Sequence, residues 1–262
     1  MTSEGTSTLS NGRVVEFPVD YSADVAGVVA VADFDALDSV TPDRLRPVRV
    51  GLRAGLVVLA GIDYRRVGDF EPYGEFAVIV PVSRHNLDGV PLSSGTIGGW
   101  VHWLPVTTEP ARLLGVDGWG YPKTVADIAF ETVAGDTETE GQQQEGRRTR
   151  RCRVAVDGQH VLTLRVEIGR TLSVDTSATS YTERDGRLVA TTVDLAGAMG
   201  VRLAGAMGVR PLDSGVHLAL GSHDRADDLR NLGLGRRLLG RQVLGSFWGR
   251  GVVGTIHCGR HV

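Results

Sequence analysis

The sequence predicts an α+β protein that is predominantly β. Valine-rich apolar runs recur between Gly, Pro and Asp, and short runs of β-branched residues are typical of strands. The pair Asp157-Gly158 separates two runs in which apolar and polar residues alternate, a pattern that predicts a tight hairpin. Strands far outnumber helices in this pattern, which favours a β-barrel or a β-sandwich. The expected strands lie within residues 26–34, 55–64, 74–82, 152–168, 186–195 and 215–221.

Helices form a minor part of the predicted fold, because only two segments have a convincing helical pattern. In the first, residues 33–45, Asp33 can act as the N-cap and Pro42 lies near the end. The second is residues 224–235, which Gly233 and Gly235 should stop.

The domain organisation is expected to be simple. Residues 1–13 are polar and predict a flexible tail, and no long polar linker divides the rest. Residues 14–262 therefore predict a single domain. A chain of 262 residues with 42% hydrophobic residues can bury a sizeable core.

Composition argues against several classes of partner and location. The formal net charge of -3 gives no indication of nucleic acid or an anionic membrane as the main partner. The N-terminal residues lack the pattern of a signal peptide, and no apolar run approaches the roughly 18 residues of a membrane span. The two cysteines, Cys152 and Cys258, have no CxxC spacing, so we expect a reduced cytoplasmic protein.

Two unusual segments remain open to more than one interpretation. Residues 137–153 run from acidic through neutral to basic. They could form an arginine-rich nucleic-acid patch, but we favour a solvated hairpin tip whose opposite charges face one another. The octapeptide LAGAMGVR occurs at 195–202 and again at 203–210, and we expect a local duplication in a Gly/Ala-rich loop.

The most informative residue is a lysine, because Lys123 is the only one in the chain, beside 27 arginines. Trp119, Tyr121 and Pro122 precede it and Val125 follows, an apolar setting for a residue type that usually lies in solvent. A neutral primary amine can attack a carbonyl and form an imine, whereas a guanidinium cannot. Burial favours the neutral amine, because desolvation disfavours the ammonium form. Lys123 is therefore a candidate nucleophile, with a solvated surface lysine as the alternative.

Three segments resemble the acetoacetate decarboxylase superfamily. Residues 108–124, TEPARLLGVDGWGYPKT, resemble the family's stretch of Glu-Pro, then Gly, then an aromatic residue followed by Pro-Lys. Residues 71–82, EPYGEFAVIVPV, resemble its Tyr-x-Glu segment, and residues 32–45 resemble its early helix. The order and separations agree over roughly residues 25–130.

The resemblance implies a β-barrel or sandwich that encloses an apolar cavity, in a homo-oligomer that uses no metal or organic cofactor. It implies that Lys123 is the Schiff-base lysine and Glu75 the acid that positions substrate and handles the proton. A lysine of this kind is the known nucleophile of acetoacetate decarboxylase, so the role is a property of the family. From their neighbourhood, Tyr73, Trp119 and Tyr121 are expected to shape the substrate cavity, and the substrate is expected to be a small carbonyl compound.

The sequence departs from the family's decarboxylases at three positions. Thr124 stands where they have a second lysine, so desolvation alone must favour the neutral amine. Ala23 and Ala60 stand near the positions of an arginine and a second buried glutamate. The imine machinery is thus expected without the polar residues of a decarboxylase, and relatives of this type use the imine for aldol condensation and dehydration.

Other candidate residues carry weaker signals. Trp100 and His102, which alternate along the expected strand GWVHW, are further candidates for the substrate site. His102 could face the cavity as an acid or base or could be a packed core histidine. His257, Cys258 and His261 have a spacing that a metal could use, but no fourth ligand lies nearby, so a docked or frayed tail is favoured.

Three hypotheses for function follow. The leading one is a lyase that forms an imine between Lys123 and a ketone or oxo-acid, with aldol condensation and dehydration slightly preferred over decarboxylation of a β-keto acid. The second keeps the cavity but uses only its shape to steer a cyclisation. The third is a metabolite-binding protein without turnover.

Overall fold

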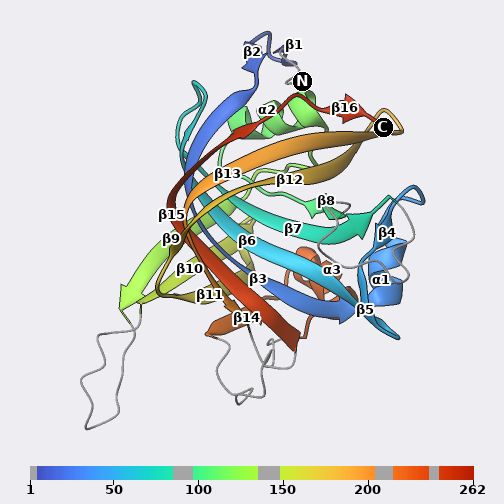
Figure 1. Ribbon diagram of the computed structural model, residues 1–262, viewed down its shortest axis with the longest axis vertical. Coiled ribbons are helices and arrows are strands. Elements are labelled where there is room, and N and C mark those ends of the chain that lie inside the picture. Colours follow the sequence, from blue (N-terminus) through green and yellow to red (C-terminus); the bar gives the residue numbers. More distant parts are fainter. Residues whose placement is uncertain (1–4, 85–96, 135–147, 204–214, 236–241) are drawn as a thin grey trace.

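The computed structural model describes residues 5–84, 97–134, 148–203, 215–235 and 242–262. Seven strands form a closed barrel in the order β7-β8-β12-β13-β15-β3-β6, and pairing of β6 with β7 completes the circle (Figure 1). Neighbouring strands are antiparallel except β8 and β12, which are parallel. The strands are β3 (Val19–Asp33), β6 (Ala54–Val67), β7 (Tyr73–Ser83), β8 (Ile97–Trp103), β12 (Leu172–Arg184), β13 (Arg187–Leu203) and β15 (Val243–Ile256).

A second, four-stranded antiparallel sheet packs against the outside of the barrel. Its order is β14-β11-β10-β9, with β14 (Val216–Leu220), β11 (Gln159–Ile168), β10 (Arg148–Val156) and β9 (Asp127–Ala134). The two layers approach closely at Gly61 of β6, where an added Cβ would lie 2.9 Å from atoms of both Cys152 and Phe130. A side chain at this position would force the layers apart, so glycine is required for their close packing.

Short elements complete the fold. Helix α2 lies near the chain termini, and α1 and α3 lie toward the other end of the barrel (Figure 1). Strands β1 and β2 form a hairpin, and the short strands β4, β5 and β16 pair with β7, β6 and β13. Their bounds are α1 (Phe34–Ser39), α2 (Glu109–Trp119), α3 (Asp224–Asn231), β1 (Gly5–Thr8), β2 (Val14–Phe17), β4 (Arg46–Pro47), β5 (Arg49–Gly51) and β16 (Arg260–His261).

Alternation along the barrel strands divides the core in two. Residues such as Val28, Leu59 and Val78 point outward and pack against the second sheet and the helices. Residues on the opposite face of the same strands, among them Tyr64 and Ala77, form an inner cluster. This inner cluster contains the aromatic residues around Lys123, so the barrel positions the candidate site.

The predicted predominance of β-structure and the barrel are both confirmed. The hairpin at Asp157-Gly158 is also confirmed, since both residues have positive φ, 49° and 74°, and join β10 to β11. This is the conformation that a two-residue turn between twisted strands requires.

Several expectations differ from the structure. The predicted tail of residues 1–13 includes strand β1, which pairs with β2, and Leu9, which is buried. The first helix ends at Ser39 and the second at Asn231, both earlier than expected. The first LAGAMGVR copy lies within strand β13 rather than in a loop, and residues 204–210 of the second lie outside the described residues.

The basic end of residues 137–153 lies on strand β10, and the solvated hairpin tip that we favoured for this segment stays a prediction. Arg151 lies opposite Glu131 on neighbouring strands, and the two form an ion pair. Arg150 pairs with Asp63 of the barrel. Residues 137–147 lie outside the described residues.

Among the helices that the structure describes, none is long and apolar enough to cross a membrane.

Candidate active site

Helix α2 and the turn after it position Lys123. Thr108 caps the N-terminus by accepting a hydrogen bond from the backbone N–H of Ala111. Gly120 ends the helix in the left-handed conformation, with φ of 69°, which a residue without a Cβ adopts freely. The chain then reverses, and Tyr121 N–H donates to the carbonyl of Gly115. The lysine stem is thereby directed back across the helix.

Gly115 makes room for that stem. A Cβ added there would lie 2.3 Å from Cδ and 2.4 Å from Cε of Lys123. These distances are shorter than any real contact, so the lysine passes directly over the bare helix backbone. The stem is buried by the helix, and its amine extends beyond the helix.

Glu75 is held on the neighbouring strand by backbone pairing on both sides. It lies opposite Ile62 in the β6–β7 ladder and forms an isolated bridge with Val106. Val106 in turn bridges Val125, two residues after the lysine. A single short segment thus joins the backbone near Glu75 to the backbone near Lys123, which fixes the separation of their side chains.

The two side chains form a buried ion pair. Nζ of Lys123 lies 2.7 Å from Oε2 of Glu75, and their side chains are only 3% and 5% exposed. No other ion pair among the described residues has both side chains less than a tenth exposed. The Lys–Glu contact lacks the angles of a hydrogen bond, and Oε2 accepts no hydrogen bond from any described residue. One carboxylate oxygen is therefore buried with a hydrogen-bonding position still available.

Aromatic rings form the wall around the amine. Nζ lies 5.2 Å from the ring centre of Tyr73 and 6.0 Å from that of Tyr121, within the range of a cation–π attraction. The ring of Tyr64 packs on Tyr73 with centres 4.8 Å apart. The Tyr121 hydroxyl shares a hydrogen bond of 2.8 Å with the hydroxyl of Ser180. These contacts hold the rings in place while leaving the amine in a surrounding of low polarity.

These tyrosines remain neutral at ordinary pH. Burial, and then the negative charge of Glu75, raise the pKa of Tyr73 and Tyr64 well above the usual value for a phenol. Burial also raises the pKa of Tyr121, despite its hydrogen bond to Ser180. The three hydroxyls can therefore donate or accept hydrogen bonds, but they are not bases at neutral pH.

Two of the three positions that depart from the family's decarboxylases belong to the same inner cluster. Ala23 and Ala60 are both buried there beside the tyrosines. Thr124, at the third position, is exposed and accepts a hydrogen bond from the indole of Trp103. None of the three brings a charge to the Lys123–Glu75 pair.

Trp119 supports the wall from behind. Its ring packs against Phe17 and Tyr121, with centres 5.1 and 5.6 Å away, and its indole N–H donates to the carbonyl of His257. These contacts hold Tyr121, and among the described residues no ring contact or hydrogen bond joins Trp119 to Lys123. Its expected role in shaping the site is therefore indirect.

The structure places Trp100 and His102 away from the lysine. A bulge in the β7–β8 register lies between Val101 and Trp103, so the alternation expected from GWVHW breaks at His102. Trp100 packs against the outer core, and the charged groups nearest His102 are Asp228 and Arg225 of α3. Both side chains are therefore on a different face of the barrel from Glu75.

This position of His102 gives a pH-dependent stability. Burial lowers the pKa of His102, with Arg225 adding to the effect and Asp228 opposing it. The unfolded chain then binds a proton from about pH 6.5 downward while the folded chain does not, so stability is lost as pH falls below that value, by at most about 1.4 kcal/mol per pH unit. In urea denaturation at several pH values, His102→Gln should reduce this loss, whereas His261→Gln at an exposed position should not. Parallel profiles for wild type and His102→Gln would contradict the assignment.

Sequence reasoning missed three contributors to the site. Gly115 stands inside the recognised Glu-Pro-to-Lys stretch, but only its contact with the stem reveals its function. Tyr64 follows the alternation of strand β6, which placed it on the inner face. Ser180 belongs to β12, a polar strand that the apolar pattern did not detect.

The C-terminal His-Cys-His segment is docked. His257 Nε2 lies 2.6 Å from Oδ2 of Asp194, and His261 belongs to β16, which pairs with β13. Among the described residues, no group of three or more His, Cys, Asp or Glu side chains is arranged to hold a metal ion.

Comparison with known proteins identifies the family. The acetoacetate decarboxylase (ADC) family matches residues 5–195. The chain belongs to the acetoacetate decarboxylase family. No match is found among curated proteins.

Solved structures of this family share the fold. The acetoacetate decarboxylase from Legionella pneumophila is 17% identical with a TM-score of 0.62, covering 94% of this chain and 87% of that one. The enduracididine biosynthesis enzyme MppR complexed with pyruvate is 18% identical with a TM-score of 0.61, covering 93% and 90%. An acetoacetate decarboxylase-like enzyme from Sphingomonas wittichii RW1 is 14% identical with a TM-score of 0.55, covering 94% and 92%. The chain therefore has the fold of acetoacetate decarboxylase-like enzymes.

Proposed function

We propose that this protein is a lyase that binds a ketone or oxo-acid as an imine on Lys123. The observation that carries the proposal is the isolated, buried pair of Lys123 and Glu75 at 2.7 Å. Taking two charges out of water costs several kcal/mol per ion, and an apolar pair of similar size would often be as stable or more stable. A buried pair of this kind inside a family of enzymes is therefore better explained by chemistry than by stability.

The short distance between Lys123 and Glu75 supports the proton transfers that imine formation needs. In the low-dielectric interior, Glu75 can accept a proton from Lys123 and leave a neutral amine. The amine attacks the carbonyl carbon, a C–N bond forms, and the carbonyl oxygen leaves as water. The protonated imine withdraws electrons from the α-carbon, and in this proposal Glu75 removes or returns a proton there.

Among the possible outcomes, aldol condensation followed by dehydration is preferred over decarboxylation. Ala23 and Ala60 bring no polar group to the site at positions where the family's decarboxylases carry charged residues. MppR, a relative in fold, has been solved with the condensation product of pyruvate and imidazole 4-carboxaldehyde. The preference is tested by adding acetoacetate: rapid release of carbon dioxide would support decarboxylation instead.

Borohydride trapping tests the imine itself. Wild-type protein is incubated with pyruvate or acetoacetate, reduced, and mapped by peptide mass spectrometry. Because the chain has one lysine, the adduct is expected on the peptide that contains Lys123.

A surface lysine gives the matched control. Arg187→Lys adds an exposed amine at the end of β13, in the same molecule as Lys123. The exposed amine should trap far more slowly than Lys123 at neutral pH. Equal trapping rates at position 187 and at Lys123 would show that burial does not make Lys123 more reactive. An unmodified Lys123 across a panel of oxo-acids, in a protein that still binds or converts a metabolite, would favour the shape-only or binding hypotheses.

A further inference from the structure

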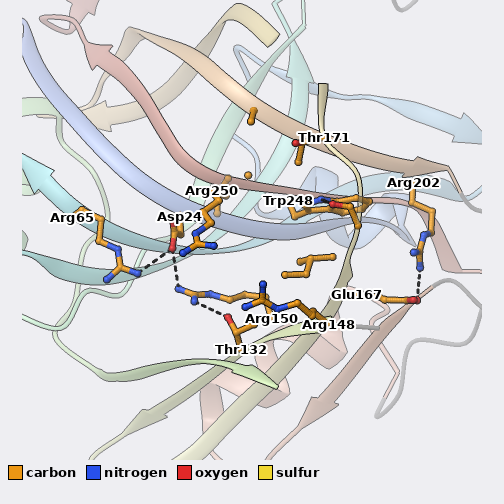
Figure 2. Close-up of a pocket in the computed structure, with 15 residues that line it drawn as sticks. Asp24, Arg65, Thr132, Arg148, Arg150, Glu167, Thr171, Arg202, Trp248 and Arg250 are labelled. Atoms are coloured by element: carbon orange, nitrogen blue, oxygen red, sulfur yellow. Dashed lines mark hydrogen bonds and ion pairs between the residues drawn. The ribbon is translucent and has the colours of Figure 1, made fainter. Parts of the chain in front are cut away.

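A large cavity lies outside the barrel, away from the lysine site. Its volume is about 810 Å³, within the usual range for small-molecule sites. It opens where the second sheet separates from the barrel, with residues of β3, β13 and β15 on one side and of β9, β10 and β11 on the other (Figure 2). Five arginines line it, and together they define what we call the arginine pocket: Arg65, Arg148, Arg150, Arg202 and Arg250.

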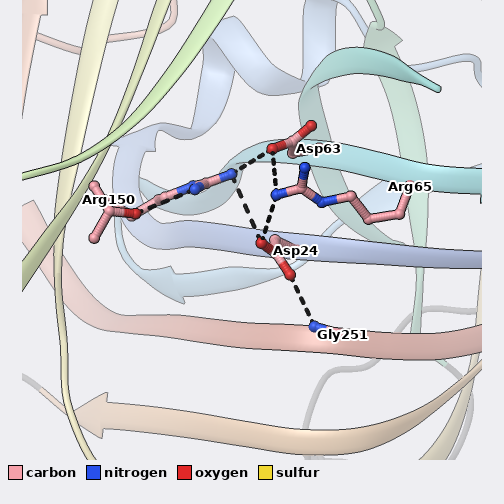
Figure 3. Close-up of polar contacts among 6 residues, drawn as sticks. Asp24, Asp63, Arg65, Arg150 and Gly251 are labelled. Carbon is pink, nitrogen blue, oxygen red and sulfur yellow. Dashed lines mark hydrogen bonds and ion pairs between the residues drawn. The ribbon is translucent and has the colours of Figure 1, made fainter.

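Part of this positive charge is balanced within the fold. Arg150 Nη2 lies 2.6 Å from Oδ2 of Asp63 and 4.0 Å from Oδ2 of Asp24. Arg65 pairs with the same two carboxylates at 3.2 and 3.0 Å (Figure 3). Arg202 pairs with Glu167 at 2.6 Å. Three carboxylates thus neutralise three of the five guanidinium groups.

The remaining two guanidinium groups have no acidic partner in the described part of the chain. Arg148 and Arg250 are exposed, and both point into the cavity from opposite sides, one from the second sheet and the other from the barrel (Figure 2). The cavity therefore carries two unbalanced positive charges on a protein whose formal net charge is -3.

The ion pairs of Asp24 and Asp63 with Arg65 and Arg150 hold the backbone near the two unpaired arginines. Asp24 also accepts a hydrogen bond of 2.8 Å from the backbone N–H of Gly251, next to Arg250. That bond and the two arginines keep the pKa of Asp24 below its usual value, so it stays charged at neutral pH. The Arg150 guanidinium also donates to Thr132 and lies 5.3 Å from the ring of Phe130. Arg150 therefore links the second sheet to the barrel.

The pocket also has an aromatic surface. Trp248 is buried along one side, where its indole N–H donates to the carbonyl of Gly169 and Arg202 lies 5.9 Å from its ring. A site that combines two free guanidinium groups with an apolar wall fits an anion that has a carbon framework.

We propose that the arginine pocket binds a small polyanion, a phosphorylated or polycarboxylated metabolite, and that Arg148 and Arg250 contact its charged groups. Arginine suits this role because its planar guanidinium can hold phosphate or carboxylate oxygens in pairs. The site is separate from the lysine site, because Asp24 and Asp63 are on the outer face of β3 and β6 while their neighbours Ala23 and Tyr64 are on the inner face. It does not depend on imine chemistry.

Calorimetric titration with inorganic pyrophosphate and with citrate tests the proposal. At low ionic strength the wild-type protein should bind at least one of the two, and added salt should weaken binding because exposed charges are screened. The double variant Arg148→Ala/Arg250→Ala should lose affinity about tenfold or more. The matched control is Arg153→Ala/Arg187→Ala, which removes two other exposed arginines, including one on the opposite face of β10, and should bind like wild type.

Each result of the titration either supports or overturns the proposed anion site. Binding of pyrophosphate alone indicates phosphorylated ligands, and binding of citrate alone indicates polycarboxylates. No binding of either anion, or equal weakening in both double variants, overturns the proposal. A different molar mass of Arg148→Ala/Arg250→Ala in light scattering, together with an unchanged affinity for the anion, also overturns the proposal. The pocket would then be a contact between copies of the chain. If the alanine variant loses its near-UV dichroism, Arg148→Gln/Arg250→Gln replaces it with the same expected results.

Discussion

Replacing Lys123 by arginine is expected to abolish borohydride trapping at position 123 and to reduce turnover of any oxo-acid to background. The guanidinium keeps a positive charge beside Glu75, so the carboxylate is not left buried without a partner. It stays protonated and cannot form an imine. The larger side chain must pass over Gly115 in the same space, and overpacking of this kind costs about 1–3 kcal/mol. Turnover, trapping and urea denaturation are measured on the same preparation.

A second substitution separates lost chemistry from lost folding. Lys123→Met removes the charge and leaves Glu75 buried alone, which should lower the free energy of unfolding by about 3–5 kcal/mol. Arginine should therefore be the more stable of the two variants, and both should be inactive. Activity of Lys123→Arg within a few-fold of wild type would show that the reaction proceeds without the amine.

Replacing Glu75 by glutamine is expected to leave trapping in place while slowing proton transfer. Glutamine has nearly the same shape but cannot accept a proton, and loss of a positioned acid or base typically costs about 10²–10⁴-fold in rate. The lysine keeps its primary amine in this variant and can still attack a carbonyl. Exchange of the methyl protons of pyruvate with deuterium, followed by NMR, reports this step without knowledge of the second substrate.

The control for this variant is Glu71→Gln, an exposed glutamate four residues earlier on the same segment. It should exchange and trap like wild type. Loss of both exchange and trapping in Glu75→Gln would show that the carboxylate acts by positioning the amine. An exchange rate equal to that of the wild type in Glu75→Gln would show that Glu75 takes no part in the proton transfer.

The strands were predictable wherever local chemistry agreed with the final packing. The turn at Asp157-Gly158 is specified by two adjacent residues that tolerate positive φ, and it formed as expected. Strand β12 was not recognised, because much of it is exposed and its residues are mostly polar. Helix α2 was missed as well: Gly115 and Gly118 weaken its helical pattern, although the cap at Thr108 and the stop at Gly120 were both visible.

The site was predictable in part. The resemblance pointed to both Lys123 and Glu75, and the structure places their charged atoms in contact. Trp100 and His102 were assigned to the wrong face, because alternation shows that they share a face opposite Val101 but does not show which face of the strand is turned into the barrel. The contact between Gly115 and the side chain of Lys123 could not be predicted either, because the local sequence pattern does not specify tertiary contacts.

The sheltered position of the lone lysine has a practical consequence for labelling. An amine-directed dye or cross-linker has Lys123 as its one side-chain target, since every other basic side chain is arginine or histidine, and that target is only 3% exposed in the folded protein. The rate at which small aldehydes of increasing width reach Lys123 would then measure the narrowest passage into the barrel, with no knowledge of the natural substrate.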